Sequence, residues 1–134
     1  MYRYLQRNKI GLIYWLLGIY WTILLVLTSL PGNDLPDINV SDKFEHFLAF
    51  YGLATLLYFS LLVQEKYKKL KKYSSSFTLL IVGSYAALDE FHQLFIPGRD
   101  CEFFDWIADF SGALAAVLIL RIILRKLLSK QFLG

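Results

Sequence analysis

The longest uncharged stretch of the chain constrains its fold more than any other feature. Residues Ile10 to Leu30 form a run of 21 residues without a charged side chain. As an α-helix this run spans roughly 31 Å, about the thickness of the hydrocarbon core of a bilayer. It is longer than the apolar core of a secretory signal peptide, about 7–15 residues, so an uncleaved helix is expected. Hydrophobic residues make up 57% of the 134 residues, and the run therefore predicts a transmembrane helix rather than part of a soluble domain.

Three further apolar segments follow, each close to the roughly 20 residues that a spanning helix needs. We expect helices at about residues 10–30, 44–63, 77–96 and 103–124. The connections between them are short, which favours antiparallel neighbours: Pro31 to Lys43, Gln64 to Ser76 and Pro97 to Glu102. The sequence therefore predicts an all-α integral membrane bundle of four antiparallel transmembrane helices, in a single domain over residues 1–134.

Basic residues gather on one side of the predicted bundle. Twelve of the fourteen Lys and Arg residues fall before the first helix, in the second loop or at the end of the last helix. Because basic residues near helix ends are retained in the cytoplasm, both termini are expected to be cytoplasmic, in the cell membrane. Ten of the eleven acidic residues fall toward the opposite, extracytoplasmic side. The positive net charge then indicates contact with lipid headgroups, and nucleic-acid binding is not expected.

Ionisable residues lie inside the predicted spans, where an uncompensated charge costs at least about 2.5–3.5 kcal/mol near the bilayer centre. Polar residues there form i,i+4 pairs, each on one face of its helix: Asp42 with His46, Asp89 with Gln93, and Asp105 with Asp109. Counted from the outer helix ends, His46 lies roughly 6 Å deep, Asp109 roughly 9 Å and Asp89 roughly 10 Å. We therefore expect these three residues to meet at one level and to form a site that faces the extracytoplasmic side.

The turn after the third segment brings a cation to the same level. Pro97 disfavours helix at the residue before it, and Gly98 permits a tight reversal, so Arg99 is expected to emerge beside the polar residues. Its guanidinium can pair with surplus carboxylates or bind a phosphate through two hydrogen bonds. His92 is expected on another face, in local packing, and Gly112 with Ala116 is a spacing that permits close helix approach.

Three motifs occur in a defined order along the chain. They are Asp42-Lys43-Phe44-Glu45-His46-Phe47, then Asp89-Glu90-Phe91-His92-Gln93-Leu94-Phe95-Ile96-Pro97-Gly98-Arg99, then Asp105-Trp106-Ile107-Ala108-Asp109 with Gly112. In order and spacing they resemble the motifs of VanZ-like membrane proteins, over about residues 10–124. In that family the position of Asp109 is commonly asparagine, so here a potential charge replaces a neutral amide. The resemblance implies a role in resistance to teicoplanin-type glycopeptides.

Three functions fit such a site. An enzyme would act on the headgroup of an envelope lipid, with His46, Asp89, Glu90 and Asp109 as candidate catalytic residues. A non-catalytic binding or assembly protein would recognise a lipid-linked wall precursor through the same groove. A proton- or ion-coupled carrier is less favoured, because four short spans without an inverted repeat leave little room for alternating access. No motif names a reaction, so enzyme status stays open. For each of the three functions, the candidate substrate-binding residues are Asp42, Lys43, Gln93, Arg99 and Asp105.

The residues establish no cofactor. The single cysteine, Cys101, excludes a cysteine metal pair within one chain. A divalent cation can offset the acid excess, although the ligand mix suits several metals; the candidate ligands are Asp42, His46, Asp89, Glu90 and Asp109. The expected partners are membrane lipids and a lipid-linked cell-wall precursor, and the oligomeric state is left open.

Overall fold

The computed structural model describes residues 2–32 and 41–131, and within these ranges the regular secondary structure is helical, without β-strands. Its helices are α1 (Tyr2–Thr28), α2 (Asp42–Val63), α3 (Lys68–Lys72), α4 (Ser74–Gln93) and α5 (Phe103–Gln131). The expected all-α fold is confirmed. Most of the expected loop from Pro31 to Lys43, namely residues 33–40, lies outside the described residues, as do the ends of the expected 1–134 domain.

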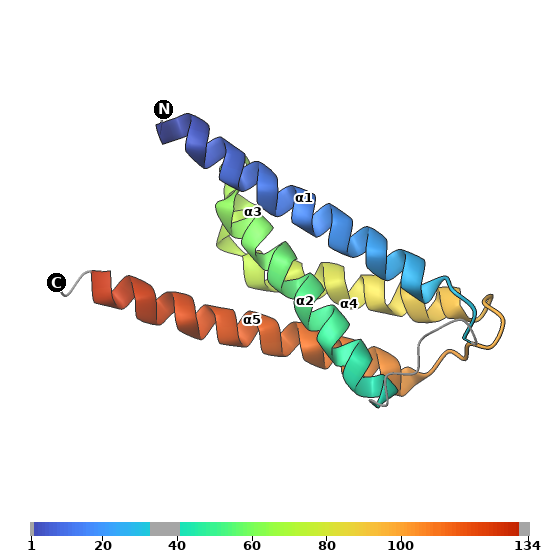
Figure 1. Cartoon of the computed structure of the whole chain (residues 1–134). Helices are drawn as coiled ribbons and strands as arrows, with labels where there is room; N and C mark the ends of the chain where they lie inside the picture. Colours follow the sequence, from blue (N-terminus) through green and yellow to red (C-terminus); the bar gives the residue numbers. More distant parts are fainter. Residues whose placement is uncertain (1, 33–40, 132–134) are drawn as a thin grey trace.

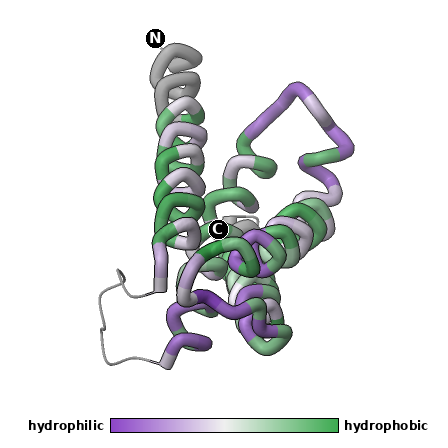
Figure 2. Tube along the Cα trace, turned by 90° about the vertical axis from the view of Figure 1, so that its right-hand side faces the viewer, coloured by the Kyte–Doolittle hydropathy of each residue, from purple (hydrophilic) through white to green (hydrophobic). Residues whose placement is uncertain are grey.

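The four long helices run side by side, and the chain reverses direction from each to the next (Figure 1). α2 crosses the others at a tilt and is the central element, since it packs most extensively against α5 and also contacts α1 and α4. α1 finishes and α2 begins at one end of the bundle, where α4 also finishes and α5 begins. We call this end the polar end. Hydrophilic segments concentrate there and in the loop that contains α3 (Figure 2).

Small residues allow α2 and α5 to approach closely. Gly112 lies directly against the backbone carbonyl of Phe47, so a Cβ at this position would meet that oxygen. Ala113 and Ala116 on α5 are fully buried, as are Leu53 and Ala54 on α2. Because apolar side chains gain little by leaving lipid tails for a protein interior, close packing of small residues is the usual contact between membrane helices. The expected role of Gly112 and Ala116 in close approach agrees with this packing.

The outer surface of the bundle is more apolar than parts of its interior, and α4 shows this most clearly. Its buried residues are small or polar, namely Ser74, Thr78, Val82, Ala86, Asp89, Glu90 and Gln93. Leu80, Leu88 and Phe91 on the same helix point outward and are mostly exposed. This distribution is the reverse of that in a soluble helical bundle, and it suits a protein surrounded by lipid.

In the part of the chain that the structure describes, three helices are long and apolar enough to cross a membrane: Ile10–Thr28, Asp42–Val63 and Phe103–Leu127. α4 does not qualify on composition, because its last turns contain Asp89, Glu90, His92 and Gln93. The apolar helices and their lipid-facing surfaces make this a membrane protein.

The helices begin and end at different residues from those expected, because hydropathy does not predict where a helix ends in a polar segment. α1 begins at Tyr2 rather than at residue 10, and α5 continues to Gln131 rather than ending at 124, because backbone hydrogen bonding continues into polar segments. α4 ends at Gln93 instead of residue 96. The N–H groups of Phe95 and Ile96 bond to the carbonyls of His92 and Gln93, which makes a turn ahead of Pro97. The short helix α3 was expected as part of a loop.

Candidate functional site

His46 lies at the centre of the polar end, held by an acid from a neighbouring helix. Its Nδ1 is 2.9 Å from Oδ1 of Asp109 on α5, and the Asp109 side chain is 0% exposed. The contact of Gly112 with Phe47 lies one turn from Asp109 and one residue from His46, and it brings the two backbones close enough for this bond. Because a carboxylate only accepts, a neutral imidazole here carries its proton on Nδ1, which leaves Nε2 as an acceptor.

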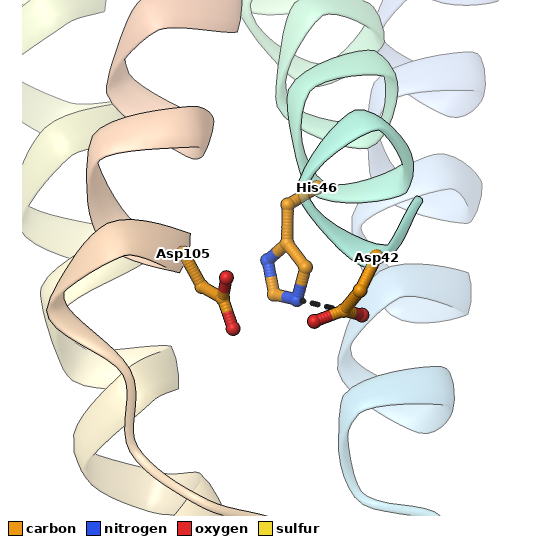
Figure 3. Close-up of side chains that lie close together, drawn as sticks. All are labelled: Asp42, His46 and Asp105. Carbon is orange, nitrogen blue, oxygen red and sulfur yellow. Dashed lines mark ion pairs between the residues drawn. The ribbon is translucent and has the colours of Figure 1, made fainter. Parts of the chain in front are cut away.

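Two more carboxylates flank the imidazole (Figure 3). Nε2 of His46 lies 3.8 Å from Oδ1 of Asp42, which precedes it by one turn on α2. Asp105, in the first turn of α5, lies on the opposite side of the ring from Asp42 in this view. One nitrogen or oxygen atom from each of these three residues lies within 4.8 Å of the other two. The expected i,i+4 pair of Asp42 and His46 therefore shares one site with Asp105.

Lys43 connects the beginnings of α2 and α5. Its Nζ donates to Oε2 of Glu102 and to Oδ1 of Asp105, each at 2.7 Å. Glu102 is half-exposed, whereas the Asp105 side chain is almost completely buried. The ammonium group therefore offsets part of the negative charge on the α5 side of the site.

The two adjacent acids of α4 make different contacts. Oε2 of Glu90 accepts the backbone N–H of Glu102 at 3.0 Å, and its Oε1 lies 4.0 Å from Nδ1 of His46. Asp89 instead accepts from Gln93 on its own helix, at 3.5 Å. The expected meeting of His46, Asp89 and Asp109 therefore holds for His46 with Asp109, while Glu90 rather than Asp89 is the α4 acid that approaches the imidazole.

Negative charge exceeds positive charge around His46. One carboxylate oxygen on each of Asp89, Glu90 and Asp109 is buried and has no hydrogen-bond partner among the described residues. Burying an unpaired carboxylate is costly, so such groups are normally protonated, paired or bound to a cation. Lys43 and His46 are the basic side chains that form ion pairs with acids in the described part of the cluster. The site therefore has the electrostatics of a cation-binding or proton-binding centre.

A pocket of about 260 Å³ opens beside the imidazole. Its polar lining includes Asp42, Glu45, His46, Gln93 and Arg99, and its apolar lining includes Leu24, Leu27, Ala49 and Phe50. A second hollow of about 430 Å³ lies between α4 and the start of α5, and Glu90, Glu102 and Trp106 are among its lining residues. The polar cluster therefore lies between two openings.

Arg99 lines the first pocket, as expected from the turn that precedes it. Gly98 has a positive φ of 72°, a conformation that glycine adopts without strain, and the N–H of Gly32 bonds to the Pro97 carbonyl at 3.2 Å. The guanidinium donates from Nη2 to the Leu27 carbonyl at 3.3 Å. Within residues 2–32 and 41–131, no carboxylate lies within ion-pair distance of it.

Residues outside the predicted set also contribute. Glu102 bonds to Lys43 through its side chain and to Glu90 through its backbone. The sequence could have indicated this role, because Glu102 directly precedes the last helix and lies three residues before Asp105. Trp106 donates its indole N–H to the Gly83 carbonyl at 3.2 Å and connects α5 to α4. His92 is exposed and pairs with Ser29 at 3.3 Å, apart from the cluster.

This geometry supports three kinds of chemistry. An imidazole that is oriented by a buried carboxylate can exchange protons at its free nitrogen. The same nitrogen, with neighbouring carboxylates, can bind a metal ion. Arg99, which lines the first pocket, has a guanidinium that can bind a phosphate.

The chain is similar to a known protein family. The family described as VanZ/LLP1 matches residues 12–125, which is most of the chain and includes every residue of the site. No curated protein and no solved structure matches the chain significantly.

Proposed function

Since the chain belongs to the VanZ/LLP1 family, we propose that it is an envelope membrane protein that binds a phosphate-bearing lipid headgroup in the pocket beside His46. The family match confirms the resemblance indicated by the three sequence motifs. Catalysis on the bound headgroup is not required by this proposal, since binding alone accounts for the arrangement of the pocket.

The proposal includes α4 as a fourth transmembrane helix. Its 20 residues reach roughly 30 Å, enough for a hydrocarbon core, and its exposed Leu80, Leu88 and Phe91 suit contact with lipid. Its polar residues face the protein interior, as intramembrane polar groups normally do. The basic residues at the other end of the bundle support a topology with both termini in the cytoplasm and the polar end outside.

The single observation that carries the proposal is that one part of the pocket lining is polar and the other part is apolar. Arg99, Asp42 and His46 form part of its polar lining, and Leu24 of α1 and Phe50 of α2 lie one helical turn further from the polar end than Thr28 and His46, respectively. A lipid presents the same division, with a polar head at the interface and an acyl or prenyl chain below it. Arg99 supplies a cation for phosphate, and Asp42 with His46 supplies acceptors for headgroup hydroxyl or amine donors.

Native mass spectrometry of the purified protein in detergent provides the test. We expect one molecule of a phosphatidylglycerol or a polyprenyl phosphate to remain bound, and inorganic phosphate to compete poorly because it lacks the chain. Arg99→Gln should weaken this binding, whereas Arg121→Gln, an exposed arginine on α5 far along the chain from the polar end, should not. Equal lipid retention by both variants would refute the assignment of the headgroup to Arg99.

Family membership extends the proposal to antibiotic tolerance. A protein that holds an envelope lipid or a lipid-linked wall precursor can alter access of a lipid-anchored glycopeptide to its target at the same membrane surface. We expect expression to raise tolerance to teicoplanin-type drugs more than to unrelated envelope stresses. A susceptibility series with equal shifts across drug classes would contradict this role while leaving headgroup binding to be judged by mass spectrometry.

A further inference from the structure

Three side chains at the polar end have the composition and spacing of a metal site. Asp42 and His46 lie one turn apart on the same face of α2, and Asp105 faces them from the first turn of α5 (Figure 3). Their ligand atoms lie within 4.8 Å of one another. Metal–ligand bonds of about 2.0–2.2 Å place ligand atoms roughly 3–4 Å apart. Small side-chain rotations therefore close this set around an ion.

The orientation of His46 is an independent observation that points to a ligand. Its side chain is only 10% exposed, and its Nδ1 is held by Asp109. Nε2 has no hydrogen-bond partner among the described residues and faces Asp42 at 3.8 Å. Metal-binding histidines usually donate their second N–H to a carboxylate, which fixes the ring and increases the basicity of the ligating nitrogen. Asp109 occupies that supporting position.

The surrounding charge and access favour an added cation. Lys43 bonds to only one oxygen of Asp105, which leaves the other available to an ion. The Asp42 side chain is 58% exposed, so an ion can reach the site without opening the bundle. A divalent ion would also offset part of the charge on the buried acids nearby.

From these observations we propose that Asp42, His46 and Asp105 bind one divalent transition-metal ion, of the Mn²⁺ or Zn²⁺ class, through Nε2 of His46 and one oxygen of each aspartate. An imidazole with two carboxylates suits these ions better than Mg²⁺ or Ca²⁺, which prefer oxygen ligands alone. The alternative trio of His46, Glu90 and Asp109 would need Nδ1, which is already bonded to Asp109.

The test uses the full chain in detergent, freed of metal by a chelator and titrated with Mn²⁺ under electron paramagnetic resonance and with Zn²⁺ in equilibrium dialysis. We expect one bound ion per chain. Asp42→Asn should weaken binding at least about tenfold, since even the loss of a supporting residue costs about 10–100-fold. His46→Gln should do the same. Glu65→Gln removes an equal charge from an exposed acid outside the cluster and should bind as the wild type does. Glu90→Gln should weaken binding less than Asp42→Asn does, because Glu90 contributes only to the local charge.

Because Asp42 is exposed, its substitution should leave the fold intact, which circular dichroism and gel filtration can check. The absence of saturable Mn²⁺ and Zn²⁺ binding by the wild type would overturn the proposal. So would binding by Asp42→Asn and His46→Gln as tight as that by Glu65→Gln. Loss of binding in Glu90→Gln with retention in Asp42→Asn would also overturn it in favour of the deeper trio. These measurements need no lipid, so their outcome is separate from that of the headgroup test.

Discussion

The bond between His46 and Asp109 permits a quantitative prediction, because both side chains are buried and the contact is direct at 2.9 Å. Asp109→Ala removes the acceptor and leaves His46 Nδ1–H unpaired, which should cost about 3–5 kcal/mol of unfolding free energy. Asp109→Asn keeps an amide oxygen in the same place. It should cost only about 1 kcal/mol, because a neutral hydrogen bond replaces one to a charged group.

The coupling between the two residues separates this bond from general damage to the core. Combining Asp109→Ala with His46→Ala should cost about 2 kcal/mol less than the sum of the single substitutions, within the range of about 0.5–3 kcal/mol found for residues in contact. Reversible unfolding in mixed detergent–SDS micelles, followed by tryptophan fluorescence, measures each free energy. His92→Ala serves as the matched control, since His92 bonds to Ser29 outside the cluster. Its combination with Asp109→Ala should be additive.

Two results would refute this reasoning. The first is a coupling free energy between His46 and Asp109 that is no larger than the one between His92 and Asp109. It would mean that the bond does not stabilise the fold. An Asp109→Asn variant as unstable as Asp109→Ala would mean that the negative charge, rather than the acceptor position, is what His46 requires. Asparagine at this position is common in the family that the motifs resemble, which makes the mild effect of Asp109→Asn the sharper of the two expectations.

Three further predictions concern packing and topology. Gly112→Ala should destabilise the fold by about 1–3 kcal/mol, because the added Cβ meets the Phe47 carbonyl. Gly18→Ala is the control, since open space surrounds Gly18, and it should leave the stability unchanged or increase it. Thermal unfolding measures both variants. Trp106→Phe should cost about 1 kcal/mol in the same assay through loss of the bond to Gly83, and an unchanged melting temperature would contradict that contact. Cys101 is exposed at the polar end and should react with an impermeant thiol reagent on intact cells, whereas a cysteine at Lys69 in a Cys101→Ser background should react only after permeabilisation. The reverse labelling pattern would invert the proposed topology.

The sequence was sufficient to predict much of the fold and one central contact of the site. Apolar runs located the four long helices, because length and hydropathy are local properties. The i,i+4 spacing and the depth of each residue predicted that His46 and Asp109 lie at one level, and the structure brings them into contact. Both estimates need only the rise of an α-helix and the position where each helix begins.

The rotation of α4 about its axis could not be predicted in the same way. Asp89 and Glu90 are adjacent, so they point about 100° apart, and either can face His46 depending on that rotation. In the structure α4 is rotated so that Glu90 approaches the imidazole while Asp89 bonds to Gln93. The pairing of Lys43 with Glu102 was missed for a related reason, since it depends on how the beginnings of α2 and α5 lie relative to each other.

The same residues stabilise the bundle and form its site, and this determines where function is best tested. In lipid, a large apolar core contributes little to helix association, so close contacts such as Gly112 with Phe47 and polar contacts such as His46 with Asp109 have a larger share in holding the helices together. Loss of activity in Asp109 variants therefore does not by itself indicate a functional role. Asp42 is different, because it is exposed and contributes little to packing. If a substitution of Asp42 abolishes ion or headgroup binding and leaves the free energy of unfolding unchanged, the loss is functional and does not come from a damaged fold.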